Sequence, residues 1–523
     1  MIRRGGTILP AAAWDKGKKG TFMLKPASLF TDGAVLCRNK EIRIFGEADS
    51  GADVTAALLD RRGEVLAEAA CRSRDGRFLV LLCPQKAQTG CRLVIRSGEE
   101  RAEAVDVAIG EVFLAGGQSN MELELRNADE GADIIREYRD PLLRFFNVPK
   151  IAVEGPEQRK ANEAARWHAV APGQGGENSA VAYFFAAKLR MKMPEIPIGI
   201  IGCYWGGTSI TCWMEEETLR TEAEGARYLD EYAARCAGKS METWLKEDRV
   251  FQDTINAWNG AVERFREAHP NAPWKEAEAA CGPAPWFPPA GPGSPYRPAG
   301  LAVTMVREVV PATLTAILYY QGEEDADKTD RYDVLMELLI RTWRTLFREP
   351  ELPFLFVQLP MWLDWDAEDR RSWARLRLAQ AKTRDAVPGT GMICLLDQGE
   401  YGNIHPTAKR PVGERLAELA GAMIFGGGEV SPRATGISAE GDALTVRLSL
   451  PVKVRGGGEA ALLEVAGEDG QYAPAKAEIL GTEIRLASET VKQPVKARYA
   501  WTDWSDRVNL FGENGLPLEP FDL

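Results

Sequence analysis

Ser119 lies in a short segment, residues 117–121 (Gly-Gln-Ser-Asn-Met), whose residue types suit a hydroxyl nucleophile. An apolar run at 112–115 precedes it, and residues 122–125 have the character of a helix start. The serine therefore falls on a tight glycine turn between strand and helix. Such a turn holds a hydroxyl at the surface with little steric cover, as nucleophilic attack requires. The surroundings are not the G-x-S-x-G pattern, and a helix N-cap serine explains this segment alone equally well.

A serine nucleophile needs a neighbouring base near neutral pH, and histidine suits this role best. The chain has 3 histidines: His168, His269 and His405. His269 stands in a charged helical stretch and is interpreted as a surface residue. His168 follows a tryptophan just before a predicted strand and is interpreted as structural. His405 follows the last strand of a predicted α/β region and precedes a helix, so it is the favoured base by elimination and by position.

Four predicted strands end in glycine together with polar side chains. In an open parallel sheet, ligands bind at the carboxyl ends of the strands. Helix capping alone does not explain the same combination at four ends, so the pattern indicates a site. The four ends are Gly-Gln-Ser-Asn at 117–120, Tyr-Trp-Gly-Gly-Thr at 204–208, Gln-Gly-Glu-Glu-Asp at 321–325, and Asp397 followed by Asn-Ile-His-Pro at 403–406.

Attack on an ester also needs donors aimed at the developing oxyanion. The backbone N–H groups of Ser119 and of the Gly206–Gly207 turn can supply them, because glycine permits close approach. A side-chain amide from Gln321 or Asn120 is the natural third donor. The alternative for each glycine is an ordinary turn between strand and helix.

Composition restricts the class of protein. The chain has 523 residues, of which 45% are hydrophobic and 27% charged, as in a soluble globular protein of roughly three domains. A net charge of -12 and a pI near 5.2 argue against nucleic acid or an anionic membrane as the main partner. No run of about 20 apolar residues exists, so no membrane span is expected.

The 9 cysteines are odd in number and include no C-x-x-C pair. This pattern favours free thiols in a reducing compartment over a disulfide framework or a zinc site, and a cytoplasmic location is expected. Residues 7–14 form a short apolar stretch that a proline breaks. No secretory signal is therefore expected in the chain as given, and an already removed signal stays an open alternative.

The pattern of the elements divides the chain into three predicted domains. Residues 1–108 read as short strands with regular turns, which is typical of a small β-sandwich. Residues 109–425 alternate apolar strand-length runs with helical stretches, which predicts an α/β domain with a parallel sheet. Residues 426–523 return to strands and turns and predict a smaller β domain. The predicted strands of the α/β domain are 112–115, 196–203, 314–320, 354–359 and 392–396, and its helical candidates are 180–191, 332–347 and 411–424.

A long insertion at about 215–300 interrupts the α/β pattern. Its first part is charged and helical, whereas its second part carries 9 prolines between Pro270 and Pro298 and predicts an irregular loop. A long loop near strand ends either shapes a binding site or packs on a partner subunit. A homo-oligomer is therefore an open alternative.

Several short motifs occur in one order and together resemble the sialate O-acetylesterase family of the SGNH hydrolases, over nearly the whole chain. The motifs are the opening at 29–36, the nucleophile block at 117–121, Trp-Gly-Gly-Thr at 205–208 with Trp213, Tyr-Gln-Gly-Glu at 320–323, Ile-His-Pro at 404–406 continuing through 412–417, Arg-Tyr-Ala-Trp at 498–501 and Gly-Leu-Pro at 515–517. Motifs in series are far more specific than any one of them.

The resemblance implies a flavodoxin-like α/β hydrolase domain, flanked by β structure, that removes acetyl groups from sugars. It implies no metal and no cofactor. By the same resemblance Ser119 is the nucleophile and His405 the base, while Gly206 or Gly207, with Gln321, helps to hold the oxyanion. The expected partner is an acetylated carbohydrate.

Two positions depart from the family pattern. Many SGNH enzymes carry an aspartate three residues before the histidine, where this chain has Gly402 followed by Asn403. The third member of a triad orients the imidazole. Here Asp397 or Glu400 takes that role, or a backbone carbonyl orients the ring and a Ser–His dyad operates. Asp325 stands where relatives often have asparagine. A carboxylate is a poor oxyanion donor, so this residue is assigned a structural or substrate-binding role.

The remaining polar residues of the four strand ends are interpreted as substrate-binding. They are Gln118, Asn120, Trp205, Glu323, Asp325 and Asn403. Tryptophans 205, 213, 362 and 365 lie near the predicted active face, where flat rings can stack on sugar, with core packing as the alternative.

Three rivals to a sugar O-acetylesterase stay open on the sequence. The first is an esterase acting on acetyl-xylan or another polysaccharide. The second is a carbohydrate-binding protein on an esterase scaffold with weak or no activity, an idea that the missing aspartate motivates. A metal-dependent deacetylase is the weakest, because three histidines and no ligand cluster offer a metal little.

Overall fold

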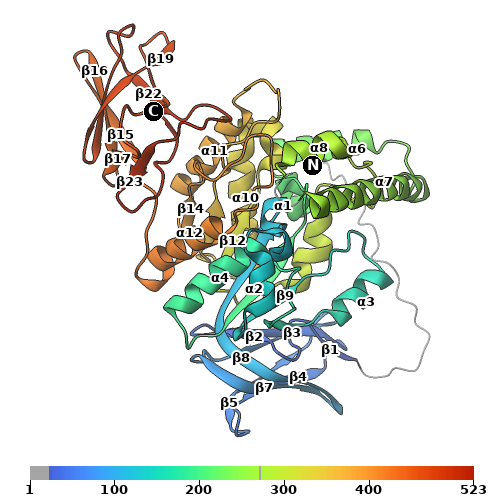
Figure 1. Cartoon of the computed structure of the whole chain (residues 1–523). Helices are drawn as coiled ribbons and strands as arrows, with labels where there is room; N and C mark the ends of the chain where they lie inside the picture. Colours follow the sequence, from blue (N-terminus) through green and yellow to red (C-terminus); the bar gives the residue numbers. More distant parts are fainter. Residues whose placement is uncertain (1–22, 270–271) are drawn as a thin grey trace, which may run out of the picture.

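The computed structural model describes residues 23–269 and 272–523. In Figure 1 the N-terminal strands lie at one end of the molecule, a helix-covered sheet fills the middle, and the C-terminal strands form a separate lobe. Residues 7–14, on which the expectation about a secretory signal rests, and Pro270 fall outside the described residues. Within the described ranges, no helix combines the length and hydrophobicity needed to cross a membrane.

The N-terminal strands build two sheets with one buried face each. In β4, Val54, Ala56 and Leu58 are buried while their neighbours are not, which is the period-two pattern of a half-buried strand. One sheet has the order β1-β3-β6, and the other joins β4, β5 and β7 to the long strand β8. The bounds are β1 (Leu24–Pro26), β2 (Val35–Cys37), β3 (Ile42–Ala48), β4 (Asp53–Leu59), β5 (Val65–Arg72), β6 (Arg77–Leu82), β7 (Gln88–Ser97) and β8 (Glu100–Gly117).

The central sheet has the order β10-β9-β11-β8-β12-β13-β14. Its strands are parallel except β10, which pairs antiparallel with β9. All residues of β11, β12 and β13 are buried, because a parallel sheet is covered on both faces and its strands read as continuous apolar runs. The bounds are β9 (Asp140–Asn147), β10 (His168–Val170), β11 (Ile198–Tyr204), β12 (Ala316–Tyr320), β13 (Phe354–Val357) and β14 (Thr390–Ile393).

Helices cover both faces of this sheet. On one face α4 packs against α12, and Phe185 of α4 meets Phe113 of β8 edge to face at 4.8 Å. On the other face α10 packs against α11, and the buried Trp343 of α10 lies 5.8 Å from the ring of Tyr319 in β12. The bounds are α1 (Ser119–Glu122), α2 (Gly131–Glu137), α3 (Pro156–Ala164), α4 (Ala180–Lys192), α9 (Arg307–Val309), α10 (Tyr332–Leu346), α11 (Ser372–Ala386) and α12 (Arg410–Ala420). Tighter or wider helical turns occur at Leu125–Asn127, Ile210–Trp213, Ala302–Val306, Glu323–Arg331 and Gly421–Phe425.

The insertion is largely helical and lies beside the top of the sheet in Figure 1. It contains α5 (Glu216–Leu219), α6 (Ala223–Arg235), α7 (Met241–Ala268) and α8 (Trp274–Cys281). The predicted irregular loop is therefore shorter than expected, because α8 begins right after Pro273. Proline is tolerated at a helix start, where its missing N–H has no intrahelical partner in any case. The segment 282–300 is irregular as predicted.

The C-terminal strands form three small antiparallel sheets, β15-β16-β21-β20, β17-β23 and β19-β18-β22-β24. Their own core includes Val446, Val465 and Leu486, and it also takes in Met361 and Leu396 from the central region. The bounds are β15 (Ala434–Glu440), β16 (Ala443–Leu448), β17 (Val452–Val454), β18 (Leu463–Ala466), β19 (Tyr472–Pro474), β20 (Lys476–Leu480), β21 (Glu483–Ala487), β22 (Lys496–Tyr499), β23 (Leu510–Gly512) and β24 (Phe521–Asp522).

Strand β8 runs straight through the predicted boundary at 108–109. Its first part pairs antiparallel with β7, and its last part, from Glu111, lies between β11 and β12. The five predicted strands of the α/β region correspond to the end of β8 and to β11, β12, β13 and β14. Strand β9 was not predicted.

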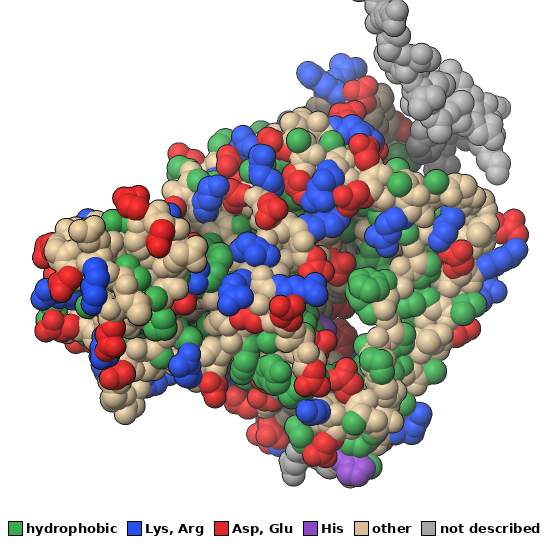
Figure 2. All heavy atoms as spheres, turned by 90° about the horizontal axis from the view of Figure 1, so that it is seen from above, with side chains coloured by type: hydrophobic (Ala, Val, Ile, Leu, Met, Phe, Trp, Pro, Cys, Tyr) green, Lys and Arg blue, Asp and Glu red, His purple; other side chains and the backbone are tan. Residues whose placement is uncertain are grey.

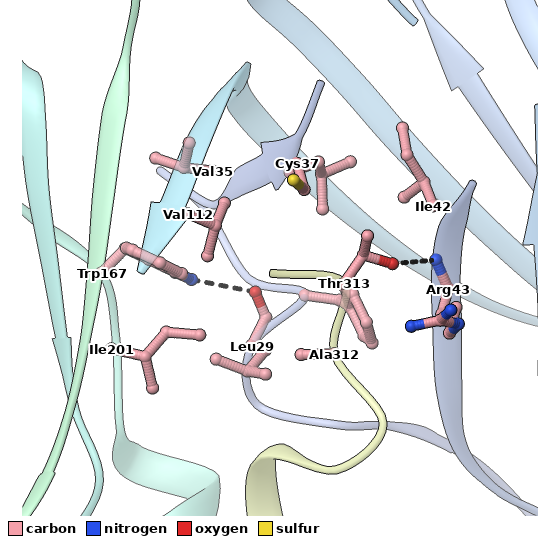
Figure 3. A pocket seen from close by; sticks show the side chains of 12 residues that line it. Leu29, Val35, Cys37, Ile42, Arg43, Val112, Trp167, Ile201, Ala312 and Thr313 are labelled. Atoms are coloured by element: carbon pink, nitrogen blue, oxygen red, sulfur yellow. Dashed lines mark hydrogen bonds between the residues drawn. The ribbon is translucent and has the colours of Figure 1, made fainter. Parts of the chain in front are cut away.

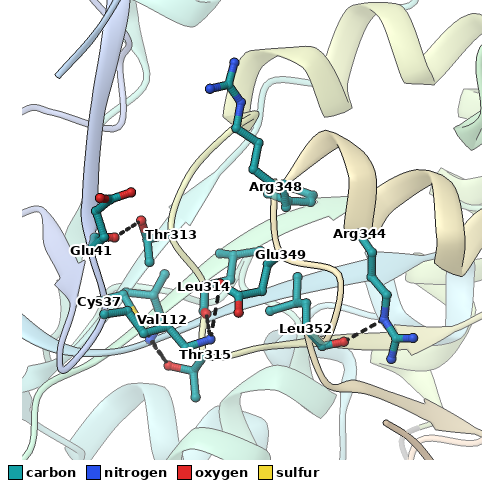
Figure 4. Close-up of polar contacts among 12 residues, drawn as sticks. Cys37, Glu41, Val112, Thr313, Leu314, Thr315, Arg344, Arg348, Glu349 and Leu352 are labelled. Carbon is teal, nitrogen blue, oxygen red and sulfur yellow. Dashed lines mark hydrogen bonds and ion pairs between the residues drawn. The ribbon is translucent and has the colours of Figure 1, made fainter. Parts of the chain in front are cut away.

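The seam between the N-terminal strands and the central sheet is closed by apolar packing and a few buried hydrogen bonds. Figure 3 shows a cavity of about 20 Å³ at the start of the parallel strands, where the Trp167 indole donates to the Leu29 carbonyl at 2.9 Å. In Figure 4, Thr315 accepts from the Val112 N–H at 3.1 Å, while Thr313 donates to the Glu41 carbonyl at 2.7 Å. This cavity lies at the opposite ends of the strands from Ser119.

The C-terminal region caps a helix of the central region. The local N-cap of α11, Arg371, makes no side-chain cap, and its φ of 59° is left-handed. The carboxylate of Asp503 instead accepts from the backbone N–H groups of Ser372, Trp373 and Ala374, at 3.2, 2.8 and 3.1 Å. These are orphan donors of the first helical turn, so a residue from a different region supplies what the local sequence lacks.

The substitution Asp503→Ala should lower the free energy of unfolding by about 1–2 kcal/mol, because three helix-end N–H groups lose their acceptor. The midpoint of urea unfolding measures this. The exposed Asp506→Ala is the matched control and should leave the midpoint unchanged. Equal midpoints for both variants would rule out the capping role.

Candidate active site

Ser119 stands at the carboxyl end of β8, on the first residue of α1. The turn depends on Gly117, whose φ is 134°. A Cβ there would lie 2.0 Å from the carbonyl oxygen of Tyr320, so no other residue fits. The N–H of Gln118 donates to that same carbonyl at 3.0 Å. The ends of β8 and β12 are thereby held together, and Ser119 is left half-buried at the surface of the sheet end.

His405 lies in the loop between β14 and α12, 286 positions from Ser119 in sequence. Its Nε2 is 2.8 Å from the Ser119 Oγ, which is a hydrogen-bond distance. His405 is exposed and Ser119 is half-buried, so a ligand can reach both. The structure thus brings together the two residues that the sequence selected as nucleophile and base.

The buried side chain of Asn120 joins the serine turn to the histidine loop. Its Nδ2 donates to the Ile404 carbonyl at 2.9 Å and to Glu323 Oε1 at 2.6 Å, and its Oδ1 accepts from Lys409 Nζ at 2.6 Å. Asn120 is fully buried, and Lys409 is 1% exposed. Because Asn120 follows Ser119 and Ile404 precedes His405, this amide fixes the two loops relative to each other.

No carboxylate of the described residues hydrogen-bonds the imidazole of His405. Asp397 is held by Arg415, with two contacts of 2.7 Å between the guanidinium and the carboxylate. Glu400 accepts from Asn403 Nδ2 at 2.8 Å, and Asn403 Oδ1 accepts from the backbone N–H of His405 at 3.0 Å. Glu400 and Asn403 therefore hold the histidine loop through its backbone, and the ring itself has Ser119 as its partner.

The surroundings favour a neutral imidazole at His405. Although the residue is exposed, protein packs closely around the ring, and this desolvation lowers the pKa of His405. The ammonium of Lys409 lowers it further. Burial also lowers the pKa of Lys409 to about 7, while the nearby carboxylates Glu323 and Glu400 oppose that shift. Below pH 7 Lys409 therefore carries its proton and opposes protonation of His405.

The predicted oxyanion donors differ in whether the protein already occupies them. The N–H of Gly206 donates to the Glu122 carboxylate. The N–H groups of Ser119 and Gly207 have no acceptor among the described residues. The Gln321 amide, 1% exposed, donates to Gln118, to the Thr208 carbonyl and to Asp325. The free donors beside the serine hydroxyl are therefore backbone N–H groups.

Three of the predicted substrate-binding residues are buried and bonded to the protein itself: Asn120, as described above, Asp325 and Gln118. Asp325 is fully buried and accepts from Ser209 Oγ, the Ile210 N–H, Gln321 Nε2 and the Tyr228 hydroxyl at 2.6–2.8 Å. This favours the structural of its two predicted roles.

Gln118, 3% exposed, accepts at Oε1 from Gln321 Nε2 and from the backbone N–H groups of Gly322 and Glu324. It ties the serine turn to the loop after β12. Glu323 is 9% exposed, and its Oε2 has no partner among the described residues.

The other predicted histidines and tryptophans lie in different settings. His168 stacks on Phe145, and its Nε2 lies 2.9 Å from Asn178 Oδ1, whereas His269 is exposed. Trp213 is fully buried in the core, and Trp205 is half-buried. Trp362 and Trp365 are half-buried near the histidine loop.

Sequence reasoning missed Lys409 and Glu122. A lysine before a helix and a glutamate in a helix start both read as solvated residues, because charged side chains are mostly exposed. The sequence did hold one signal: Lys409 follows His405 by four positions, shortly after the Ile-His-Pro motif. Its burial depends on Asn120 and Glu323, which lie far away in sequence.

Comparison with known proteins identifies relatives of this site and fold. A family profile described as "Carbohydrate esterase, sialic acid-specific acetylesterase" matches residues 286–421, which include His405. The sialate O-acetylesterase of Rattus norvegicus is 24% identical over 499 residues, covering 88% of this chain and 86% of the rat protein. The human sialate O-acetylesterase is 22% identical over 561 residues, covering 99% and 95%. A carbohydrate acetylesterase from Xanthomonas citri superposes with a TM-score of 0.73 and 28% identity, covering 96% of this chain and 99% of that chain.

The pKa of His405 should lie below the ordinary histidine value of 6.5. The substitution Lys409→Met should raise this pKa, because it removes a neighbouring positive charge. Carbon-13 NMR of labelled histidine measures it, and the resonance that His405→Gln removes gives the assignment. The exposed Lys246→Met is the control and should leave the titration unchanged. A His405 pKa above 6.5 in the native chain would contradict the inferred electrostatics.

Proposed function

The chain belongs to the sialate O-acetylesterase family of carbohydrate esterases, and from this premise we propose that it hydrolyses acetyl esters of sugars at Ser119 and His405. The observation that carries the proposal is the 2.8 Å contact between His405 Nε2 and Ser119 Oγ at the carboxyl end of the sheet. A neutral imidazole in hydrogen-bond reach of a hydroxyl is the arrangement that general-base catalysis requires.

The proposed reaction has two halves. In the first, Ser119 Oγ attacks the acetyl carbonyl carbon while His405 Nε2 takes the hydroxyl proton. The tetrahedral intermediate then collapses, the carbon–oxygen bond to the sugar breaks, and His405 returns the proton to the sugar oxygen. In the second half, water gives a proton to His405 and attacks the acetyl carbon of the acetyl-serine. The bond from that carbon to Oγ then breaks, His405 returns the proton to Ser119 Oγ, and acetic acid leaves and ionises to acetate.

The oxyanion of each intermediate needs preorganised donors. The backbone N–H groups of Ser119 and Gly207, which have no acceptor among the described residues, support a backbone oxyanion hole. Gly206 can join them if the Glu122 carboxylate releases its N–H. Gln321 acts in this proposal by holding the strand ends together, since its amide is bonded to three protein acceptors.

We propose a Ser–His dyad whose ring is positioned by the backbone of its loop. Asp397 is bound by Arg415, and Glu400 reaches the loop through Asn403. Without a carboxylate on the ring, the imidazolium that forms during attack is stabilised less. The proposal therefore implies a slower enzyme than a full triad would give.

The strand order supports the finer fold assignment. Strands β11-β8-β12-β13-β14 have the order 2-1-3-4-5 when numbered along the chain, and β9 and β10 extend the sheet beside β11. The order 2-1-3-4-5 is that of flavodoxin-like sheets, with its switch point between β8 and β12, beside Ser119, and it supports the proposed SGNH assignment. We further propose a reducing, cytoplasmic location, which the 9 free cysteines support.

An acetylated polysaccharide such as acetyl-xylan is the alternative substrate, and release of acetate from it rather than from acetylated sialic acid would favour that alternative. A carbohydrate-binding protein without activity is the other rival. Covalent labelling of Ser119 by an organophosphate would exclude this rival, because only an activated serine reacts in this way.

The substitution Ser119→Ala should lower acetate release from an acetylated sugar by at least about 10³-fold, because the nucleophile is lost. Because the pair acts as a unit, His405→Ala should lose a comparable factor. Kinetics with a chromogenic acetate ester measure both. The exposed Ser449→Ala is the matched control and should retain the full rate. Equal rates for Ser119→Ala and the unchanged chain would end the proposal.

The activity should persist in excess EDTA, because the proposed steps use serine and histidine alone. Within residues 23–269 and 272–523, no group of three His, Cys, Asp or Glu side chains is arranged to hold a metal ion. The rate of acetate release before and after prolonged chelation and dialysis is the measurement. A loss that added Zn²⁺ restores would instead support metal-dependent deacetylation.

A further inference from the structure

The irregular segment 282–300 of the insertion places aromatic side chains next to the serine turn. A Cβ on Gly207 would lie 2.2 Å from Cη2 of Trp286 and 3.2 Å from Cε1 of Tyr296. The two rings meet edge to face at 5.6 Å. The φ of Gly207 is 70°, so both its backbone conformation and the space taken by the indole require glycine.

Gly206 connects this aromatic pair to the nucleophile. A Cβ on Gly206 would lie 3.3 Å from the Cβ of Ser119. The indole of Trp286 therefore packs against Gly207, whose neighbour Gly206 lies beside Ser119. Despite this packing, Trp286 is 43% exposed and its neighbour Phe287 is 78% exposed. An aromatic side chain that is held on one side and open on the other can receive a ligand.

Carboxylates surround the same place. The backbone N–H of Glu324 donates to Gln118, the residue before Ser119, so Glu324 lies at the same strand end as the nucleophile. The negative charges of Glu122 and Glu324 also add to desolvation in raising the pKa of the Tyr296 phenol. Glu122 is paired with Lys150 and bonded to the Gly206 N–H. Glu324 is exposed and forms no ion pair with a described residue. Desolvation and the neighbouring Asp325 carboxylate raise the pKa of Glu324 to about 7, so this group is mostly ionised only above pH 7. Figure 2 shows acidic and hydrophobic side chains together around a hollow on this side of the molecule.

We propose that Trp286, backed by Tyr296, is the subsite for the sugar ring whose acetyl group Ser119 attacks, and that Glu324 makes this subsite selective for an uncharged ring. The proposal rests on the proposed function, because the sugar is the leaving alcohol of that reaction. The apolar C–H face of a pyranose suits the exposed indole face, and a carboxylate accepts hydrogen bonds from sugar hydroxyls. When it is ionised, the unpaired Glu324 carboxylate repels a sugar that carries its own carboxylate.

The first test is Trp286→Ala assayed with two esters. KM for glucose pentaacetate should rise about tenfold with little change in kcat, because stacking is lost in the ground and transition states alike. Methyl acetate has no ring and reports any effect on the neighbouring Gly207, so the rise in KM should be specific to the sugar ester, and Trp286→Phe should restore most of the sugar KM. Leu245→Ala, a 50% exposed apolar residue elsewhere on the insertion, is the matched control and should change neither ester.

The second test is Glu324→Gln assayed at pH 8, where Glu324 is mostly ionised, with a charged and an uncharged acetylated sugar. The native chain should prefer glucose pentaacetate over 9-O-acetyl-N-acetylneuraminic acid. The substitution should raise the relative kcat/KM of the charged sugar about threefold or more, because the repelling charge is removed. An unchanged ratio, or a native preference for the charged sugar, overturns the selectivity.

The two levels of the proposal fail differently. If the native chain does not hydrolyse methyl acetate or glucose pentaacetate, the proposed function itself fails. If it hydrolyses both and Trp286→Ala leaves the sugar KM unchanged, only the subsite fails. In that case the exposed rings belong to a surface that serves another partner.

Discussion

The geometry of the site depends on one buried amide, Asn120. Its Nδ2 donates to the Ile404 carbonyl, next to His405, and its Oδ1 accepts from the ammonium of Lys409. In the sequence Asn120 directly follows Ser119. A buried polar group is costly unless its hydrogen bonds are made, so each of these partners stabilises the others in place. Two loops from distant parts of the sequence are thereby held at a distance over which a proton can pass.

Much of the central fold could be predicted from the sequence, because buried parallel strands appear there as continuous apolar runs. Strands β11, β12 and β13 each fall on a predicted run. Strand β9 was missed because Arg144 interrupts its apolar residues. In the structure this arginine is 4% exposed and donates to the backbone carbonyls of Gly33 and Asp106. From one sequence alone, a buried arginine whose partners lie far away in the chain cannot be distinguished from an exposed one.

The same reasoning divides the site into a predictable and an unpredictable part. Ser119 and His405 were selected because glycine turns and strand ends leave a local pattern. The hydrogen bonds of Asp325 and the packing of Trp286 against Gly207 leave no such local pattern in the sequence, because each depends on contacts with other loops. The insertion was expected to be a site wall or a partner surface, and the position of Trp286 against Gly207 favours the wall.

Strand β8 has a mechanical consequence, because the N-terminal sheet and the central sheet share it. Its 18 residues do not form one straight rod, since Asp106 has a φ of 53° and the register with β7 shifts between Cys91 and Leu93, which marks a bulge. Beyond this bend, the last part of the strand is paired on both sides, by β11 and β12, and this leaves the segment before Ser119 little freedom to move. Any opening of the cleft during turnover therefore falls to the histidine loop and the aromatic segment, while the nucleophile stays with the doubly paired end of β8.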